Sequence, residues 1–299
     1  MMKHWNKWLA AGALMGLALS AQAGRLDQIR ERGEVALGYR EASLPFSYLD
    51  DKQQPVGYST DICMGVVEAL KQKLQLPGLR VKRVPVTSST RIPLVANGTV
   101  DMTCGSATNN EQRQKQVAFA PTMFITHTRL AYRKDSGVGN LESLKGKTVV
   151  STAGTSSLLW LTQANAERKL GIRIMPAKDH AEAFLAVERG RAAAFMMDDV
   201  LLAGLVANSR KPDDWVIGEE TFTTEPYAVI LPKNDPEFKQ VVDEAVEAMM
   251  RDGRMEKLYE KWFTQPIPPR GINLNWPLGD ALKRVFAEPT DSPDPAVYQ

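Results

Sequence analysis

The feature that most constrains the fold is the regular alternation of strand-like and helix-like segments along the chain. Residues 34–40, EVALGYR, read as a buried strand, and residues 60–74 place apolar side chains at helical spacing. Residues 79–87 and 99–106 read as further strands, with a short helix between them that ends at Gly98. Because strands that alternate with helices are typical of layered α/β folds, we predict a central sheet flanked by helices.

A similar order of elements returns in the second half of the chain. The stretches PLVANGTVDMTCGS and LAVERGRAAAFMMDD both run from a helix through a glycine and one further residue to a short strand with a polar end. This weak internal similarity favours two α/β lobes of similar plan.

The last strand-like segment, PYAVILPKND, and the two helices predicted after it have no partner left in a second lobe. The simplest arrangement returns the chain to the first lobe, so that two strands cross between the lobes near residues 125 and 225. From Thr264 onward, the proline-rich segments predict a surface wrap and a loose end. The expected divisions are a leader at 1–23, a first lobe made of 24–125 and 226–299, and a second lobe at 126–225.

The chain begins with the features of an export signal. Lys3 and Lys7 precede an apolar run from Leu9 to Leu19, which closes on Ala21-Gln22-Ala23. The alternative is a membrane anchor, but the run is shorter than the roughly 20 apolar residues that span a bilayer. We therefore expect cleavage after Ala23 and an exported protein, and no later segment reads as a membrane span.

The charge balance argues against nucleic acid as a partner. The chain has 37 basic and 35 acidic residues, and two of the basic residues, Lys3 and Lys7, lie in the predicted leader. A nucleic-acid-binding surface requires an excess of positive charge, which the remaining chain lacks. Its length suits two lobes, and we expect a monomer.

The two cysteines, Cys63 and Cys104, leave two alternatives open. In an oxidising compartment they could form a disulfide, which would close a loop of about 40 residues and stabilise the fold by roughly 4 kcal/mol. The other alternative is two buried free thiols. With only His127 and His180 beyond the leader and no paired spacing, we expect no metal site. No cofactor motif is complete, since the GKT at Gly146 lacks the earlier glycine of a phosphate-binding loop.

Polar side chains gather at the ends of the predicted strands, where ligands bind in open α/β sheets. Helix starts predicted at Thr108, from a capping box with Glu111, and at Thr155-Ser156 add unpaired amides that attract anions. Each residue also has a plainer interpretation, as a solvated arginine or a capping hydroxyl. The signal is their coincidence at strand ends. The candidate ligand-binding residues are Arg40, Ser88, Arg91, Ser106, Thr108, Arg113, Thr155, Ser156, His180 and Asp198.

The charges of these candidates point to one class of ligand. Arginine presents a planar, permanently charged fork that matches a carboxylate or a phosphate. Three candidate arginines and one candidate aspartate complement an amino acid that carries two carboxylates and one ammonium group.

Several stretches of the chain resemble the glutamate/aspartate-binding proteins of ABC transporters, which are periplasmic. The stretches are GYREASLPFSYLD, VGYSTDICMGVVEALK, PVTSSTRIPLVANGTVDMTCGSATNNEQRQKQVAF and AKDHAEAFLAVERGRAAAFMMDDVLLAG. The resemblance extends over nearly all of the chain beyond the leader. It implies two lobes joined by two crossover strands, a ligand enclosed between them, and an ABC permease in the membrane as partner.

The resemblance also implies a role for each candidate residue. Arg113 would hold the α-carboxylate with the helix start at Thr155 and Ser156, and Asp198 would hold the α-ammonium near Ser106 and Thr108. The side-chain carboxylate would be surrounded by Arg40, Ser88, Arg91 and His180. The family pattern has threonine where this chain has Ser156 and Ala107. It often has a second cysteine in the PYAVILPK strand, where this chain has none, so the resemblance does not assign a pairing to Cys63.

Two other functions remain as alternatives. An enzyme on the same fold, such as a dehydratase of a cyclic acid, would need a general acid or base in the cleft, and His180 and Asp198 are the residues available for it. A soluble amino-acid sensor would use the same ligand site.

Overall fold

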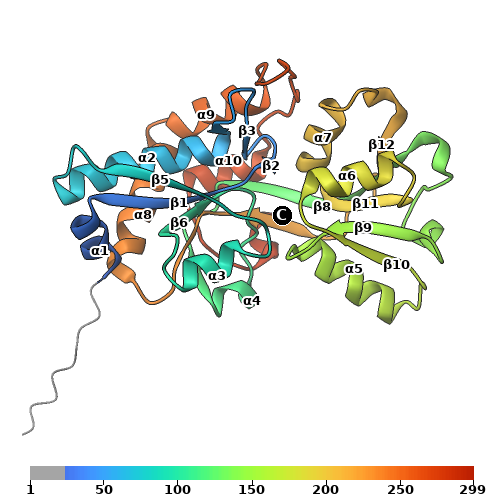
Figure 1. Cartoon of the computed structure of the whole chain (residues 1–299), viewed down its shortest axis with the longest axis horizontal. Coiled ribbons are helices and arrows are strands. Elements are labelled where there is room, and N and C mark those ends of the chain that lie inside the picture. Colours follow the sequence, from blue (N-terminus) through green and yellow to red (C-terminus); the bar gives the residue numbers. More distant parts are fainter. Residues whose placement is uncertain (1–23) are drawn as a thin grey trace, which may run out of the picture.

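The computed structural model describes residues 24–299, so the predicted leader at 1–23 lies outside the described residues. The described part forms two large sheets that lie side by side, each flanked by helices, and one small sheet (Figure 1). The predicted two-lobed α/β fold is therefore confirmed. Among the helices of residues 24–299, none has the length and apolar character needed to cross a membrane.

The first lobe is built on a mixed sheet of five strands in the order β5-β1-β6-β14-β7. Strand β1 is parallel to β5 and β6, and β14 is antiparallel to β6 and β7. The strands are β1 (Glu34–Tyr39), β5 (Arg80–Pro85), β6 (Met102–Cys104), β7 (Val117–Phe119) and β14 (Ile230–Pro232). The helices of this lobe are α1 (Arg25–Arg32), α2 (Tyr58–Leu74), α3 (Arg91–Ala96), α4 (Glu111–Gln114), α8 (Pro236–Arg251), α9 (Arg254–Phe263) and α10 (Asp280–Ala287). A small antiparallel sheet joins β2 (Ala42–Ser43), β3 (Ser47–Leu49) and β4 (Pro55–Val56).

The second lobe repeats this plan with a six-stranded sheet in the order β10-β9-β11-β8-β12, in which β13 also pairs with β8. Its strands are β8 (Phe124–Arg133), β9 (Thr148–Thr152), β10 (Arg173–Ala177), β11 (Ala194–Asp198), β12 (Trp215–Ile217) and β13 (Thr224–Tyr227). Its helices are α5 (Ser156–Glu167), α6 (His180–Glu188) and α7 (Asp199–Ala207). The predicted start of α6 is confirmed, because the Asp179 side chain accepts a hydrogen bond from the Glu182 amide.

Two antiparallel strands connect the lobes. Strand β8 pairs with β13 over Phe124 to His127 and continues into the second sheet beside β11 (Figure 1). Both connections start from an aromatic cluster in the first lobe, where Phe124 stacks on Phe263 with ring centroids 4.8 Å apart and Tyr227 meets Phe46 edge-on at 5.1 Å. The expected lobe boundaries fall inside β8 and β13, and they stay a prediction.

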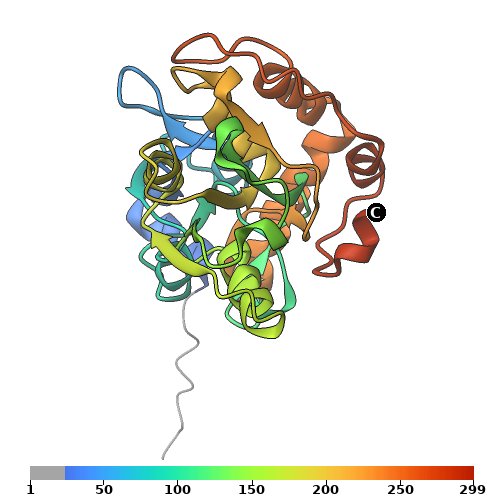
Figure 2. The same ribbon diagram turned by 90° about the vertical axis from the view of Figure 1, so that its right-hand side faces the viewer.

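The predicted loose C-terminal end is wrong. Figure 2 shows the red C-terminal segment running along one side of the molecule. Its last turn, Pro295–Tyr298, is a 3₁₀ helix, and the buried Tyr298 hydroxyl lies 2.8 Å from the Thr122 hydroxyl. The Asn109 amide donates to the carbonyl of Asp291 at 2.8 Å, so the tail packs behind the loop that follows β6. The prolines indicated irregular backbone, but they do not prevent packing by the aromatic and aliphatic side chains between them.

Cys63 and Cys104 form a disulfide that joins α2 to the end of β6. This decides between the two alternatives that the sequence left open. Because the next residues after β6 are Gly105 and Ser106, the disulfide fixes the backbone directly before a predicted ligand residue.

We expect the double variant Cys63→Ser/Cys104→Ser to lose about 4 kcal/mol of unfolding free energy, because a bridge across a loop of this size restricts the unfolded chain. The two cysteines are 41 residues apart in the sequence. Urea denaturation followed by circular dichroism measures the loss, with wild-type protein in reductant as the matched reference. An unchanged urea midpoint would contradict a stabilising disulfide.

Candidate functional site

All ten predicted ligand residues lie at the junction between the two lobes. Nine of them are buried and Ser156 is half-buried. The first lobe supplies six residues, from the segments that follow β1, β5 and β6 and from the helices α3 and α4: Arg40, Ser88, Arg91, Ser106, Thr108 and Arg113. The second lobe supplies four residues, from the starts of α5 and α6 and the end of β11: Thr155, Ser156, His180 and Asp198.

Three buried arginines form a cluster of positive charge. Burial lowers the pKa of Arg40 to about 10. Burial also lowers the pKa of Arg91 well below its usual range, and the adjacent charges of Arg113 and Arg40 lower it further. Among residues 24–299, none of the three forms an ion pair with a carboxylate. Because arginine remains charged and a buried charge is costly without a partner, this cluster favours an anionic ligand.

Backbone carbonyls hold two of these arginines in place. Arg91 Nη1 donates to the carbonyl of Ser106 at 2.6 Å. Arg113 Nη1 donates to the carbonyl of Thr108 at 2.8 Å, and its Nη2 reaches the carbonyl of Gly154 in the second lobe at 3.2 Å. Neutral carbonyls orient a guanidinium group without cancelling its charge.

Several buried polar atoms of the predicted site have no hydrogen-bond partner within residues 24–299. Leaving such an atom unpaired costs about 1–3 kcal/mol, so native proteins rarely gather several of them without a reason. The atoms are Arg40 Nη1, Ser88 Oγ, Arg91 Nε, Ser106 Oγ and His180 Nε2. These atoms come from both lobes. All of these residues except Ser106 are the ones expected to surround the side-chain carboxylate of the ligand.

Asp198 supplies a buried negative charge opposite the arginines. Its carboxylate accepts hydrogen bonds from the hydroxyls of Thr128 at 3.1 Å, Ser157 at 3.2 Å and Tyr227. Burial raises the pKa of Asp198 to about 7, and the negative charge of Glu225 contributes to the increase. A cation beside this carboxylate would lower that pKa again, which fits a partner such as an ammonium group.

His180 is a neutral member of the site. Burial lowers the pKa of His180 well below its ordinary value, and the charges of Arg40 and Arg91 lower it further. Its Nδ1 and the Thr152 hydroxyl lie 2.8 Å apart in a hydrogen bond, which leaves Nε2 for another partner. The ring can therefore hydrogen-bond a ligand without adding charge.

Of the two helix starts predicted as anion sites, the start at Thr155-Ser156 lies where it was predicted and the start at Thr108 is wrong. Thr155 caps α5, and its hydroxyl accepts from the Leu158 amide at 3.2 Å. Thr108 caps no helix, because α4 begins at Glu111 with Asn110 as its capping residue. Thr108 instead bridges to Tyr227 on the crossover strand, and this pairing outweighs the local capping signal.

Two buried residues of β13 that contact the candidate site, Glu225 and Tyr227, were not predicted from the sequence. Both are buried, and the prediction considered only the carboxyl ends of strands, whereas these residues lie within a crossover strand. The available signal was a glutamate inside an otherwise uncharged strand. Thr128 and Ser157, which contact Asp198, were also missed. Thr128 lies inside a crossover strand, and Ser157 directly follows the predicted helix start at Thr155-Ser156.

The two lobes are in direct contact around this site. Gly154 lies so near Ser89 that a Cβ atom placed on it would be 2.6 Å from the Ser89 Cα atom. The hydroxyls of Thr108 and Ser156 lie 3.3 Å apart across the junction. The structure therefore represents the closed arrangement of the lobes.

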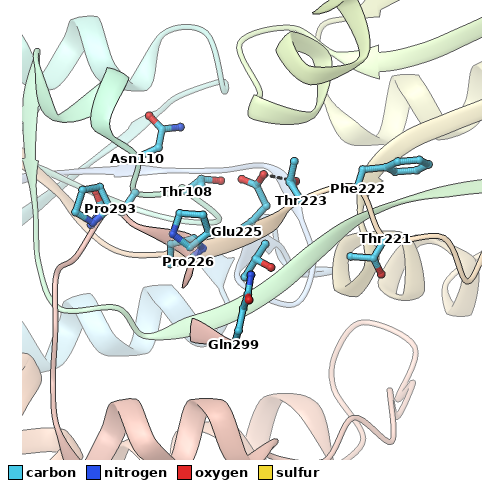
Figure 3. Close-up of a pocket in the computed structure, with 12 residues that line it drawn as sticks. Thr108, Asn110, Thr221, Phe222, Thr223, Glu225, Pro226, Pro293 and Gln299 are labelled. Carbon is cyan, nitrogen blue, oxygen red and sulfur yellow. Dashed lines mark hydrogen bonds between the residues drawn. The ribbon is translucent and has the colours of Figure 1, made fainter. Parts of the chain in front are cut away.

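Two hollows adjoin the junction. One of about 390 Å³ is lined from both lobes by residues that include Arg113, Gly154 and Ser156. The other, of about 440 Å³, lies between the crossover strand and the C-terminal tail, and Figure 3 shows Thr108, Thr223 and Glu225 along it. In the part of the chain that the structure describes, no group of three or more histidine, cysteine or acidic residues is placed to hold a metal ion.

Most of the chain matches a family profile. Residues 35–265 match the profile of the bacterial extracellular solute-binding proteins, family 3. The chain belongs to this family.

Two relatives are similar to this chain over almost their whole length. The L-glutamate/L-aspartate-binding protein of Pseudomonas aeruginosa is 50% identical over 290 residues, which cover 95% of this chain and 96% of the relative. The glutamate/aspartate import solute-binding protein of Salmonella typhimurium is 47% identical over 288 residues, which cover 95% of each.

Solved structures share the fold. A mutant of ArgBP from T. maritima superposes with a TM-score of 0.71 at 27% identity, covering 79% of this chain and 98% of that protein. The likeness extends over both lobes, in agreement with the two-sheet architecture described above.

Proposed function

We propose that this protein is a solute receptor that binds L-glutamate or L-aspartate between its two lobes and delivers it to an ABC permease. One observation carries the proposal: three buried arginines without a carboxylate partner face one buried aspartate across the lobe junction. An amino dicarboxylate has two carboxylates that can pair with the arginines and one ammonium group that can pair with the aspartate. The names of the Pseudomonas and Salmonella relatives support the same ligand class.

The proposed contacts follow the charges in the site. Arg113 and the start of α5 at Thr155-Ser156 bind the α-carboxylate, and Asp198 binds the α-ammonium, with Ser106 and Thr108 beside it. The side-chain carboxylate is held by the unpaired polar atoms of Arg40, Ser88, Arg91 and His180. The second lobe closes after the ligand binds to the first, and closure strengthens each charged contact because it excludes water.

The proposal includes where the protein works and how its chain is divided. A leader at 1–23, cleaved after Ala23, would direct it to the periplasm, and it would act there as a monomer. The first lobe would comprise 24–125 and 226–299, and the second 126–225. The permease would supply the energy-requiring step of transport.

The related proteins are binding proteins, and we propose no catalytic role for His180 or Asp198. In the enzyme alternative, one of them would act as general acid or base. Each has a binding role instead, and the ring of His180 is neutral and held by Thr152.

Calorimetric titration of the refolded protein with the common amino acids tests the proposal, since refolding from denaturant removes any ligand carried from the cell. We expect binding of glutamate and aspartate, with glutamine and asparagine weaker by at least roughly 100-fold, because an amide leaves a buried arginine without its anion. Glutamine is the matched control because it has nearly the same shape as glutamate. Equal affinity for glutamine and glutamate would contradict the proposed recognition of two carboxylates.

A further inference from the structure

Glu225 is a second buried carboxylate at the lobe junction, and the contacts proposed for the ligand do not use it. Its residue is only 3% exposed. Oε2 accepts a hydrogen bond from the Ser156 hydroxyl at 2.7 Å, and Oε1 accepts one from the Thr223 hydroxyl at 2.5 Å. Figure 3 shows the Glu225 side chain between Thr108 and Thr223, on the crossover strand that connects the lobes.

The charge of Glu225 has no local counterion. Both hydrogen-bond donors are neutral hydroxyls, and within residues 24–299 no lysine, arginine or histidine forms an ion pair with it. Its negative charge instead influences an arginine of the candidate site. Burial lowers the pKa of Arg113, and the negative charge of Glu225 is the strongest influence in the opposite direction. Glu225 therefore acts electrically on the residue proposed to bind the α-carboxylate.

The charges buried at the junction can be counted. Arg40, Arg91 and Arg113 contribute three positive charges, and Asp198 and Glu225 contribute two negative charges when an ammonium group beside Asp198 keeps its carboxylate ionised. His180 is neutral because its pKa is lowered, and Tyr227 is neutral because burial raises its pKa well above the ordinary value. The closed site therefore carries one net positive charge.

Two further aspartates near the site have partners of their own and are left out of this count. Asp199 is paired outside the arginine cluster, where its carboxylate lies 3.5 Å from Arg129 Nε and accepts a hydrogen bond from Thr126. Asp179 is half-buried at the start of α6, where it accepts from the Glu182 amide, and its negative charge raises the pKa of Arg40 against the effect of burial.

A glutamate or aspartate zwitterion carries one net negative charge at neutral pH, so the closed site around it is neutral. A dicarboxylate of the same length without the amino group carries two, so the same site around it would hold one net buried negative charge or would have to take up a proton on Asp198, whose pKa is raised by burial and by the charge of Glu225. Burying an uncompensated charge is costly, so the charge count itself discriminates between the two ligands.

We propose that Glu225 is a specificity-determining residue: its carboxylate sets the net charge of the closed site so that an amino dicarboxylate is preferred over a dicarboxylate that lacks the amino group. This inference rests on the function proposed above. It assigns to Glu225 a part of the ammonium selectivity that would otherwise be attributed to Asp198 alone.

Calorimetric titration with L-glutamate and with glutarate, its analogue without the amino group, tests the proposal. Glu225→Gln keeps the shape of the side chain and removes its charge. We expect the ratio of glutamate affinity to glutarate affinity to fall by a factor on the order of ten or more relative to wild type, because one buried negative charge has been removed. Glu219→Gln makes the same chemical change at an exposed position on the same segment, and it should leave the ratio unchanged.

A merely structural role for Glu225, such as fixing Ser156, predicts a different result. Both affinities would then fall by the same factor in Glu225→Gln and the ratio would be preserved, which would overturn the proposal. Glu225→Asp retains the charge while shortening the side chain, so we expect it to preserve the ratio even where the absolute affinities drop. A ratio that falls in Glu225→Asp would overturn the proposal independently of how well Glu225→Gln folds.

The failure of this inference and the failure of the proposed function can be told apart. Wild-type protein that binds neither glutamate nor aspartate would remove both. Wild-type protein that binds glutamate, together with an unchanged ratio in Glu225→Gln, would remove only the role of Glu225.

Discussion

Replacing Arg113 by alanine should weaken glutamate binding by about 2–5 kcal/mol, roughly 30- to 5000-fold in Kd, because the α-carboxylate would be enclosed without its counterion. Arg113 is buried and its guanidinium is held by carbonyls from both lobes, at Thr108 and Gly154. Its loss therefore removes a proposed ligand contact and a contact that joins the lobes. Isothermal titration at low and moderate salt measures the change.

The control is Arg189→Ala, which removes an exposed arginine at the end of α6 and should leave Kd within a factor of two or three. Arg113→Lys keeps the positive charge but loses the planar fork, and we expect an intermediate loss. Unchanged affinity in Arg113→Ala would show that the α-carboxylate is bound elsewhere.

The sequence predicted the architecture because its main signals are local. The helix periodicity, the glycines that end helices and the strand-helix alternation all depend on near neighbours, and each lobe repeats them. The ten candidate residues could be expected to lie together because the carboxyl ends of strands converge whenever a parallel α/β sheet forms. Arg40 and His180, which lie 140 residues apart in the sequence, illustrate this, since the charge of the first lowers the pKa of the second.

The features that were missed depend on contacts between distant segments. Thr108 carries a good capping signal, but its bridge to Tyr227 fixes an extended backbone there. Glu225 and Tyr227 join the site through the pairing of β8 with β13, which has no local sequence signature. The C-terminal tail is ordered because Tyr298 packs against Thr122, more than 170 residues earlier. Such contacts are visible only once the chain is folded.

The second large effect is expected at Gly154, because closure of the lobes requires a residue without a side chain there. A Cβ atom at Gly154 would lie 2.6 Å from the Ser89 Cα atom and 2.7 Å from its nitrogen, which are backbone atoms of the opposite lobe. Backbone cannot move aside as a flexible side chain can. Gly154→Ala should therefore hold the lobes apart and weaken the contact between Arg113 and the Gly154 carbonyl. If the closed fraction falls roughly 100-fold, Kd for glutamate rises by the same factor.

Gly190→Ala separates this effect from backbone strain. Gly190 and Gly154 have similar positive φ angles, +70° and +78°, but a Cβ atom at Gly190 meets nothing within 4 Å. Both variants should therefore lose a similar amount of stability, on the order of 1 kcal/mol, because alanine disfavours this backbone conformation. Only Gly154→Ala should lose affinity, and X-ray scattering with saturating glutamate should show it failing to compact as wild type does. Equal Kd values for the two variants would mean that the contact between Gly154 and Ser89 is not needed for the closed, ligand-holding state.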